Sequence, residues 1–171
     1  MPDLVLPRIA SGNLRSDLDL TNEEAAELLT LTSQVKKTPR DYRQALQHLT
    51  LGLLFEKPSL RTRFTFEVAI RQLGGDAVVQ VGRISEREPV KDVARNVERW
   101  CDAIVARTFY QETVEELARY SRKPVINALS DRYHPCQALA DVFTMQERFG
   151  SLKGQRLAFV GDGFNVAHSL L

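Results

Sequence analysis

Residues 49–63 read LTLGLLFEKPSLRTR, and this stretch joins an apolar run directly to a cluster of cations and hydroxyls. The run at 49–55 is typical of a buried strand, and Pro58 interrupts it. From Phe66 onward, apolar residues recur at the spacing of one helix face. The stretch therefore predicts a strand, a short turn and the first turn of a helix.

The start of this predicted helix has the features of an anion-binding site. Its unpaired N–H groups and the positive end of the helix dipole favour an anion. Ser59 and Thr62 add hydroxyl donors, while Arg61 and Arg63 add guanidinium groups that pair with phosphate oxygens. The pattern predicts a phosphate site; the alternative is a solvated basic helix start.

Strand and helix candidates then alternate along the chain. A capping box, Thr21 with Glu24, opens a first helix that ends near Lys37. After the strand at 49–55, apolar runs lie at 77–81, 103–106 and 124–129, and helical patterns lie between and after them, the last from Pro135 to Gly150. This order predicts an α/β fold, in which helices flank a parallel sheet of about four strands.

Residues 1–150 are expected to form this domain, and residues 151–171 the start of a second one. Residues 156–160 are predicted to be a new buried strand, and Gly161-Asp162-Gly163 its turn into a further helix. We therefore expect 151–171 to be the beginning of a truncated second α/β domain.

Composition excludes several classes of protein. The formal net charge of +1 argues against a general nucleic-acid binder, and no apolar run is long enough to span a membrane. Cys101 and Cys136 are far apart and match no metal-binding spacing, so we expect no metal site. The N-terminus lacks a targeting pattern, and the cytoplasm is the expected compartment.

Polar clusters follow three of the predicted strands: residues 59–63, Arg107, and residues 134–137. Ligands of such folds bind beyond the carboxyl ends of the strands, so the three clusters are expected to converge. His134 and Gln137 can both bond a carbonyl group, and His134 can alternatively cap a helix. Arg107 needs an anionic or carbonyl partner, or an ion pair with a carboxylate such as Glu67 or Asp102.

These motifs resemble a known family. FEKPSLRTR at 55–63, ARTF at 106–109, HPCQALAD at 134–141 and GDGFN at 161–165 are similar to motifs of the aspartate/ornithine carbamoyltransferase family, and the ornithine-specific members match most closely. The resemblance covers nearly the whole chain. A chance match to both SxRTR and HPxQ in this order and spacing is very improbable.

The resemblance implies transfer of the carbamoyl group of carbamoyl phosphate to the side-chain amine of ornithine, which gives citrulline in arginine biosynthesis or degradation. It implies no metal or organic cofactor. It assigns catalysis to Arg107, His134 and Gln137, and ornithine binding to Asn165. The residues expected around carbamoyl phosphate are Ser59, Leu60, Arg61, Thr62, Arg107, His134, Pro135, Cys136 and Gln137.

The chain also departs from the family. Members are roughly twice as long and have a second domain for the amino acid, so this chain alone is expected to bind carbamoyl phosphate without turnover. Phe164 replaces a usual Asn, and the loop at 80–88 is altered. Members form homotrimers with sites between subunits, which makes Gln80 and Arg83 candidates for a cross-subunit loop. The alternatives are another amine acceptor (putrescine, N-acetylornithine or aspartate) and a non-catalytic binding module.

Overall fold

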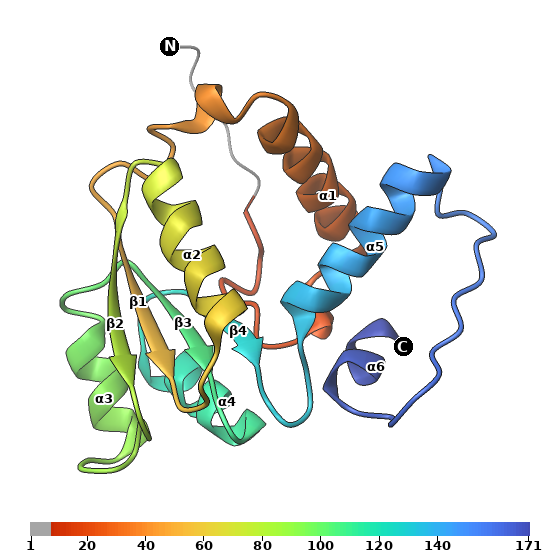
Figure 1. Ribbon diagram of the computed structural model, residues 1–171. Helices are drawn as coiled ribbons and strands as arrows, with labels where there is room; N and C mark the ends of the chain where they lie inside the picture. Colours follow the sequence, from red (N-terminus) through yellow and green to blue (C-terminus); the bar gives the residue numbers. More distant parts are fainter. Residues whose placement is uncertain (1–7) are drawn as a thin grey trace.

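The computed structural model describes residues 8–171 and contains one parallel sheet (Figure 1). Its strands are β1 (Thr50–Phe55), β2 (Asp76–Val81), β3 (Ala103–Arg107) and β4 (Val125–Leu129). They lie in the order β2-β1-β3-β4, and every neighbouring pair is parallel. The predicted four-stranded parallel sheet is confirmed.

Helices connect the strands and flank the sheet. Thr21 and Glu24 form the predicted capping box at the start of the first helix. The helices are α1 (Asn22–Lys37), α2 (Leu60–Gln72), α3 (Val90–Val97), α4 (Gln111–Tyr120), α5 (Pro135–Phe149) and α6 (Asn165–Leu170), with 3₁₀ turns at Asp17–Asp19 and Pro39–Tyr42.

The sheet separates two hydrophobic cores, because successive residues of a strand point to opposite faces. Leu54 and Ile104 pack against α3 and α4 on one face. Leu53, Phe55 and Val105 lie in the second cluster with Ile70 of α2. Figure 1 shows α3 and α4 on one side of the sheet and α2 on the other. Both faces of the sheet are therefore covered, as the alternating pattern predicts.

The strand order reverses at β1, which determines where a ligand binds. β2 lies on one side of β1 and β3 on the other, so the chain leaves the carboxyl ends of β1 and β3 in different directions. Such a switch point opens a crevice at the carboxyl edge of the sheet. Phe55 and Arg107 are paired at this edge, and the N–H of Glu56 donates to the carbonyl of Arg107 at 2.8 Å. The helices α2 and α5 both begin at this edge (Figure 1).

The prediction of a buried strand at 156–160 is wrong. These residues form neither strand nor helix, and all five are exposed, Val160 to 95%. A strand needs a neighbour to pair its backbone groups, and within residues 8–171 no other strand lies beside this segment. The helix expected after Gly163 does form, as α6. No helix within residues 8–171 is both long enough and apolar enough to cross a membrane.

Candidate functional site

An open cleft of about 1080 Å³ lies where α2, α5 and the ends of β3 and β4 meet. It brings together the three polar clusters that the sequence places after separate strands, which confirms their predicted convergence. Its lining consists of Pro58, Ser59, Leu60, Arg61, Thr62, Thr65, Phe66, Arg107, Leu129, His134, Cys136, Gln137 and Ala140.

The first wall of the cleft is the start of α2. Ser59 is the N-cap residue, and its hydroxyl makes no capping bond, so it remains available to a ligand. Arg61 is exposed and forms no ion pair with any residue of 8–171. Arg63, in contrast, pairs with Glu67 at 2.6 Å and does not line the cleft. The helix start therefore offers free backbone N–H groups, hydroxyls and one guanidinium to an anion.

Arg107 forms the floor of the cleft, at the end of β3. Its Nη1 donates to Thr62 Oγ1 at 3.2 Å, and its buried Nε has no hydrogen-bond partner among the described residues. Burial lowers the pKa of Arg107, although a guanidinium stays protonated at neutral pH. A charged donor left unpaired in this position is costly.

The alternative of an ion pair for Arg107 is wrong. The carboxylate of Glu67 is engaged by Arg63, and that of Asp102 by Lys123 at 3.1 Å. No carboxylate within residues 8–171 forms an ion pair with Arg107. The positive charge of Arg107 is therefore free to act on a bound molecule.

His134 lies opposite, at the start of α5. It is the N-cap residue, as the alternative predicts, but its side chain makes no capping bond. Burial lowers the pKa of His134 to about 4, and the charge of Arg107 acts in the same direction, while Asp141 opposes them. The imidazole is therefore neutral at pH 7. Its buried Nδ1 has no partner among the described residues.

The other residues of the HPCQ motif have different surroundings. Gln137 is exposed in the cleft, and its Nε2 donates to Asp141 Oδ1 at 2.9 Å. The Cys136 thiol donates to the Asn127 carbonyl at 3.5 Å, and burial raises its pKa to about 11. A thiol with this pKa is not a nucleophile at neutral pH. Pro135 is buried behind the cleft at the first position of α5 and does not line it.

The cleft also contains residues that are not assigned to the site from the sequence, namely Pro58, Thr65, Phe66, Leu129 and Ala140. Leu129 is the most unusual, because it has a φ of +149°, which side-chain-bearing residues rarely adopt. It pairs with Arg107 just where the register between β3 and β4 shifts. Local strain thus lies beside the Arg107 floor. A glycine would have signalled this geometry in the sequence, whereas a leucine does not.

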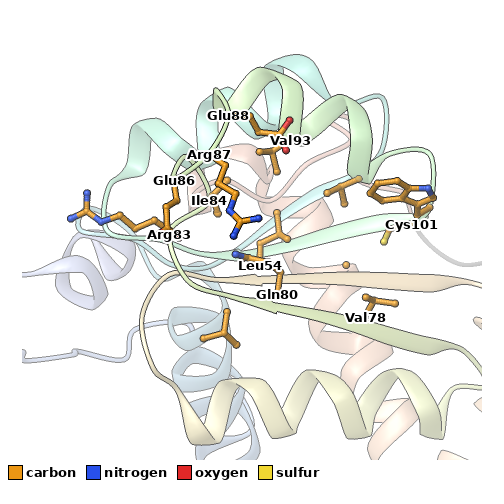
Figure 2. Close-up of a pocket in the computed structure, with 14 residues that line it drawn as sticks. Leu54, Val78, Gln80, Arg83, Ile84, Glu86, Arg87, Glu88, Val93 and Cys101 are labelled. Carbon is orange, nitrogen blue, oxygen red and sulfur yellow. The ribbon is translucent and has the colours of Figure 1, made fainter.

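Besides Pro135, two groups of predicted site residues lie outside the cleft. Asn165 is buried: its Nδ2 donates to the Ser130 carbonyl at 2.7 Å, and its Oδ1 accepts from the N–H of Val166 at 2.9 Å. Gln80 and Arg83 line a separate hollow of about 680 Å³ between β2 and α3, shown in Figure 2. Their assignment to ornithine and to a cross-subunit loop remains a prediction.

Glu56 connects the loops around the cleft. Its carboxylate accepts from the N–H of Ile84 at 3.1 Å and from the N–H of Phe109 at 2.8 Å. The ring of Phe109 also lies close to two cations, 5.1 Å from Lys57 Nζ and 5.7 Å from Arg83 Cζ. One carboxylate thus ties together the segments that follow β1, β2 and β3. Within residues 8–171, no three His, Cys, Asp or Glu side chains gather as a metal site would require.

Comparison with known proteins places this geometry in a family. Residues 13–147 match the model of the aspartate/ornithine carbamoyltransferase, carbamoyl-P binding domain. The chain belongs to this family. The match includes both walls of the cleft, from the loop before α2 to the start of α5.

Individual relatives agree with the family model. Ornithine carbamoyltransferase of Thermus thermophilus is 54% identical over 160 residues, which are 90% of this chain and 53% of the relative. The enzyme of the same name from Vibrio sp. (strain 2693) is 49% identical over 162 residues, 93% of this chain and 54% of the relative. The chain thus spans about half the length of the curated relatives it matches.

Solved structures show the same fold. The crystal structure of ornithine carbamoyltransferase from Thermus thermophilus has a TM-score of 0.88 at 50% identity, covering 97% of this chain and 57% of that one. The Pyrococcus furiosus ornithine carbamoyltransferase has a TM-score of 0.92 at 42% identity, covering 96% of this chain and 54% of that one. The α/β fold of the carbamoyltransferase family is therefore shown for nearly the whole described chain.

Proposed function

We propose that this chain is the carbamoyl-phosphate-binding half of an ornithine carbamoyltransferase. The observation that supports this best is the cleft, where the start of α2, Arg107 and the start of α5 form its walls and floor. Residues 1–150 would be the carbamoyl-phosphate domain, and residues 151–171 the start of the domain for the amine acceptor. By itself the 171-residue chain would bind carbamoyl phosphate without turning it over.

The phosphate group would lie at the start of α2. The N–H groups of Leu60, Arg61 and Thr62 form the positive end of the helix dipole, and Ser59 adds its uncapped hydroxyl. The exposed guanidinium of Arg61 would neutralise the phosphate oxygens and the charge that remains on them as phosphate departs. This half of the site binds any phosphate and does not by itself select carbamoyl phosphate.

The carbamoyl group would lie between Arg107 and the start of α5. Arg107 keeps a positive charge and an unpaired Nε, and the neutral His134 can donate one N–H to the carbonyl oxygen. Gln137 would bond the carbamoyl NH₂ or the same oxygen. Donors arranged around this oxygen stabilise the negative charge that forms on it during acyl transfer. Cys136 would form part of the wall, and Pro135 would start α5 behind it, and neither would take part in bond making.

In the complete enzyme, the neutral side-chain amine of ornithine would attack the carbonyl carbon and form a C–N bond. The tetrahedral intermediate then breaks its C–O bond to phosphate, which leaves with the electron pair, and the nitrogen loses a proton. The products are citrulline and phosphate, which serve arginine biosynthesis or degradation. Acceptors such as putrescine, N-acetylornithine and aspartate are the alternatives, because the selecting residues belong to the other domain.

The same family argument extends to assembly. A homotrimer with sites between subunits is our proposal, in which Gln80 and Arg83 reach a neighbouring cleft. It is supported by their place on an exposed edge, away from the cleft of their own chain. The cytoplasm is the compartment we propose, since both cysteines are free.

Calorimetric titration of the 171-residue chain with carbamoyl phosphate and with inorganic phosphate tests the binding site. Arg61→Ala removes a charge-assisted contact and is expected to weaken the affinity for both ligands by about tenfold or more. Arg71→Ala, near the other end of α2, is the matched control and should leave both affinities unchanged. Unchanged affinity in Arg61→Ala would contradict the assigned site.

The acceptor needs a second experiment, with the sequence extended to the length of the relatives. Carbamoyl transfer to a panel of amines is measured, and ornithine is expected to be the preferred substrate. Transfer to aspartate but not to ornithine would overturn the choice of acceptor while leaving the phosphate site intact.

A further inference from the structure

One face of α6 holds the loop that leads to His134. Asn165, His168 and Ser169 are spaced i, i+3 and i+4, so they lie on one side of the helix. The Nδ2 of Asn165 donates to the Ser130 carbonyl at 2.7 Å, and Nδ1 of His168 lies 3.1 Å from the Arg132 carbonyl. All three side chains bond the backbone of the 130–134 loop.

The third contact is the one nearest the chemistry. The hydroxyl of Ser169 accepts a hydrogen bond from the backbone N–H of His134 at 3.0 Å. Because the imidazole of His134 makes no capping bond of its own, it does not fix the start of α5. Ser169 is only 7% exposed and Asn165 only 6%, so water does not compete strongly for these bonds.

The rest of the loop is held by its own bonds and by two neighbouring side chains. The Ser130 hydroxyl donates to Gln111 Oε1 at 2.6 Å, and Asn127 Nδ2 donates to the Tyr133 carbonyl at 3.4 Å. The hydroxyl of Ser130 accepts from the N–H groups of Arg132 and Tyr133 at 3.2 and 3.1 Å, which closes the turn. These bonds shape the loop but end one residue before His134. The Ser169 hydroxyl is therefore the side-chain partner of the His134 backbone, at the residue where the loop passes into α5.

We propose that Ser169 is a positioning residue that directs His134 toward the carbamoyl group, and that Asn165 supports it by holding Ser130. This inference rests on the proposed function. Its consequence is that the first helix of the acceptor domain orders the carbamoyl half of the pocket, while the phosphate half at the start of α2 is independent of it. The residue expected to meet ornithine, Asn165, belongs to the same hydrogen-bonded unit as the loop of His134.

The test compares two ligands on the 171-residue chain by calorimetry. Ser169→Ala is expected to weaken the affinity for carbamoyl phosphate by about fivefold to tenfold, which is the effect of one lost hydrogen bond. The affinity for inorganic phosphate should stay within about twofold of its original value. Ser169→Thr keeps the hydroxyl and should restore carbamoyl phosphate binding. Ser151→Ala, at an exposed serine outside the cleft and outside the 80–88 loop, is the matched control. If Ser169→Ala does not fold, Ser169→Cys replaces it, because a thiol is a weak acceptor of similar size.

A second readout does not depend on the ligand. The chain has three histidines, so the ring signals of His134 can be assigned by NMR from single substitutions at His48 and His168. Ser169→Ala is expected to move the His134 signals and Ser151→Ala to leave them in place. If the His134 signals do not move, or if the affinities for both ligands fall equally, the positioning role is overturned. Failure of the unchanged chain to bind either anion would instead overturn the proposed function.

Discussion

Protonation of His134 should make the stability of this chain depend on pH in a defined range. The pKa of His134 is about 4 in the folded chain, against an ordinary value of 6.5, because the imidazole is buried and faces Arg107. A lowered pKa means that the unfolded chain takes up the proton first. The neutral form thus stabilises the fold fully above pH 6.5, and this contribution is lost as the pH falls from 6.5 toward 4.

The size of the effect follows from the two pKa values. Each pH unit between them is worth about 1.4 kcal/mol, so the whole range corresponds to about 3 kcal/mol. Between pH values of about 7.5 and 5, linkage predicts a loss of about 2 kcal/mol from His134 alone. This is a large part of the stability of an ordinary domain.

Urea unfolding at a series of pH values, followed by circular dichroism, measures this loss. The chain is compared with His134→Gln, which cannot take up the proton, and with His48→Gln as the matched control. Asp19 and Asp102 also have lowered pKa values, but they titrate in all three proteins and cancel in the difference. Equal losses in the unchanged chain and in His134→Gln would refute a buried, neutral imidazole.

Two further substitutions test the structure around the cleft. Glu56→Gln replaces a carboxylate that accepts two backbone N–H groups with a side chain that has one acceptor, and should cost about 1–3 kcal/mol in urea unfolding; exposed Glu86→Gln should cost nothing measurable. Gly52→Ala places a methyl group 3.0 Å from Cys101 Sγ inside the core. This substitution should lower the free energy of unfolding by about 1–3 kcal/mol, which is measured as a lower melting temperature. Cys101→Ala should recover part of this loss, and Gly163→Ala, which meets no atom within 4 Å, should be neutral.

The sheet and the cleft could be predicted from the sequence because the signals for them are local. The stretch from Phe55 to Arg63 contains a strand end, a proline and a helix start. Each of these signals depends only on residues that are close together in the sequence. Arg107 and His134 follow strands of the same parallel sheet, so a general rule of such folds brings them to one edge. No tertiary contact has to be known for either step.

Other features depend on contacts between distant residues and leave no local signal. The strand expected at 156–160 has the right composition, but pairing requires a neighbouring strand that the described residues do not supply. The free charge of Arg107 follows only once Glu67 and Asp102 are seen to pair elsewhere. The bond from His134 to Ser169 joins residues 35 positions apart, and no spacing in the sequence predicts it.

The exposure of the cleft would limit how strongly this chain alone binds the proposed anion. Leu60 is 72% exposed, and Arg61 and Gln137 are exposed as well, so water surrounds one side of a bound ligand. Charge interactions in such surroundings are several-fold weaker than in a site that excludes water. A covering domain would therefore contribute twice, by bringing the amine and by strengthening the hold of Arg61 and Arg107 on the developing negative charge. Under the proposed domain division, α6 would begin that covering domain, and its Ser169 already bonds the backbone N–H of His134 beside the cleft.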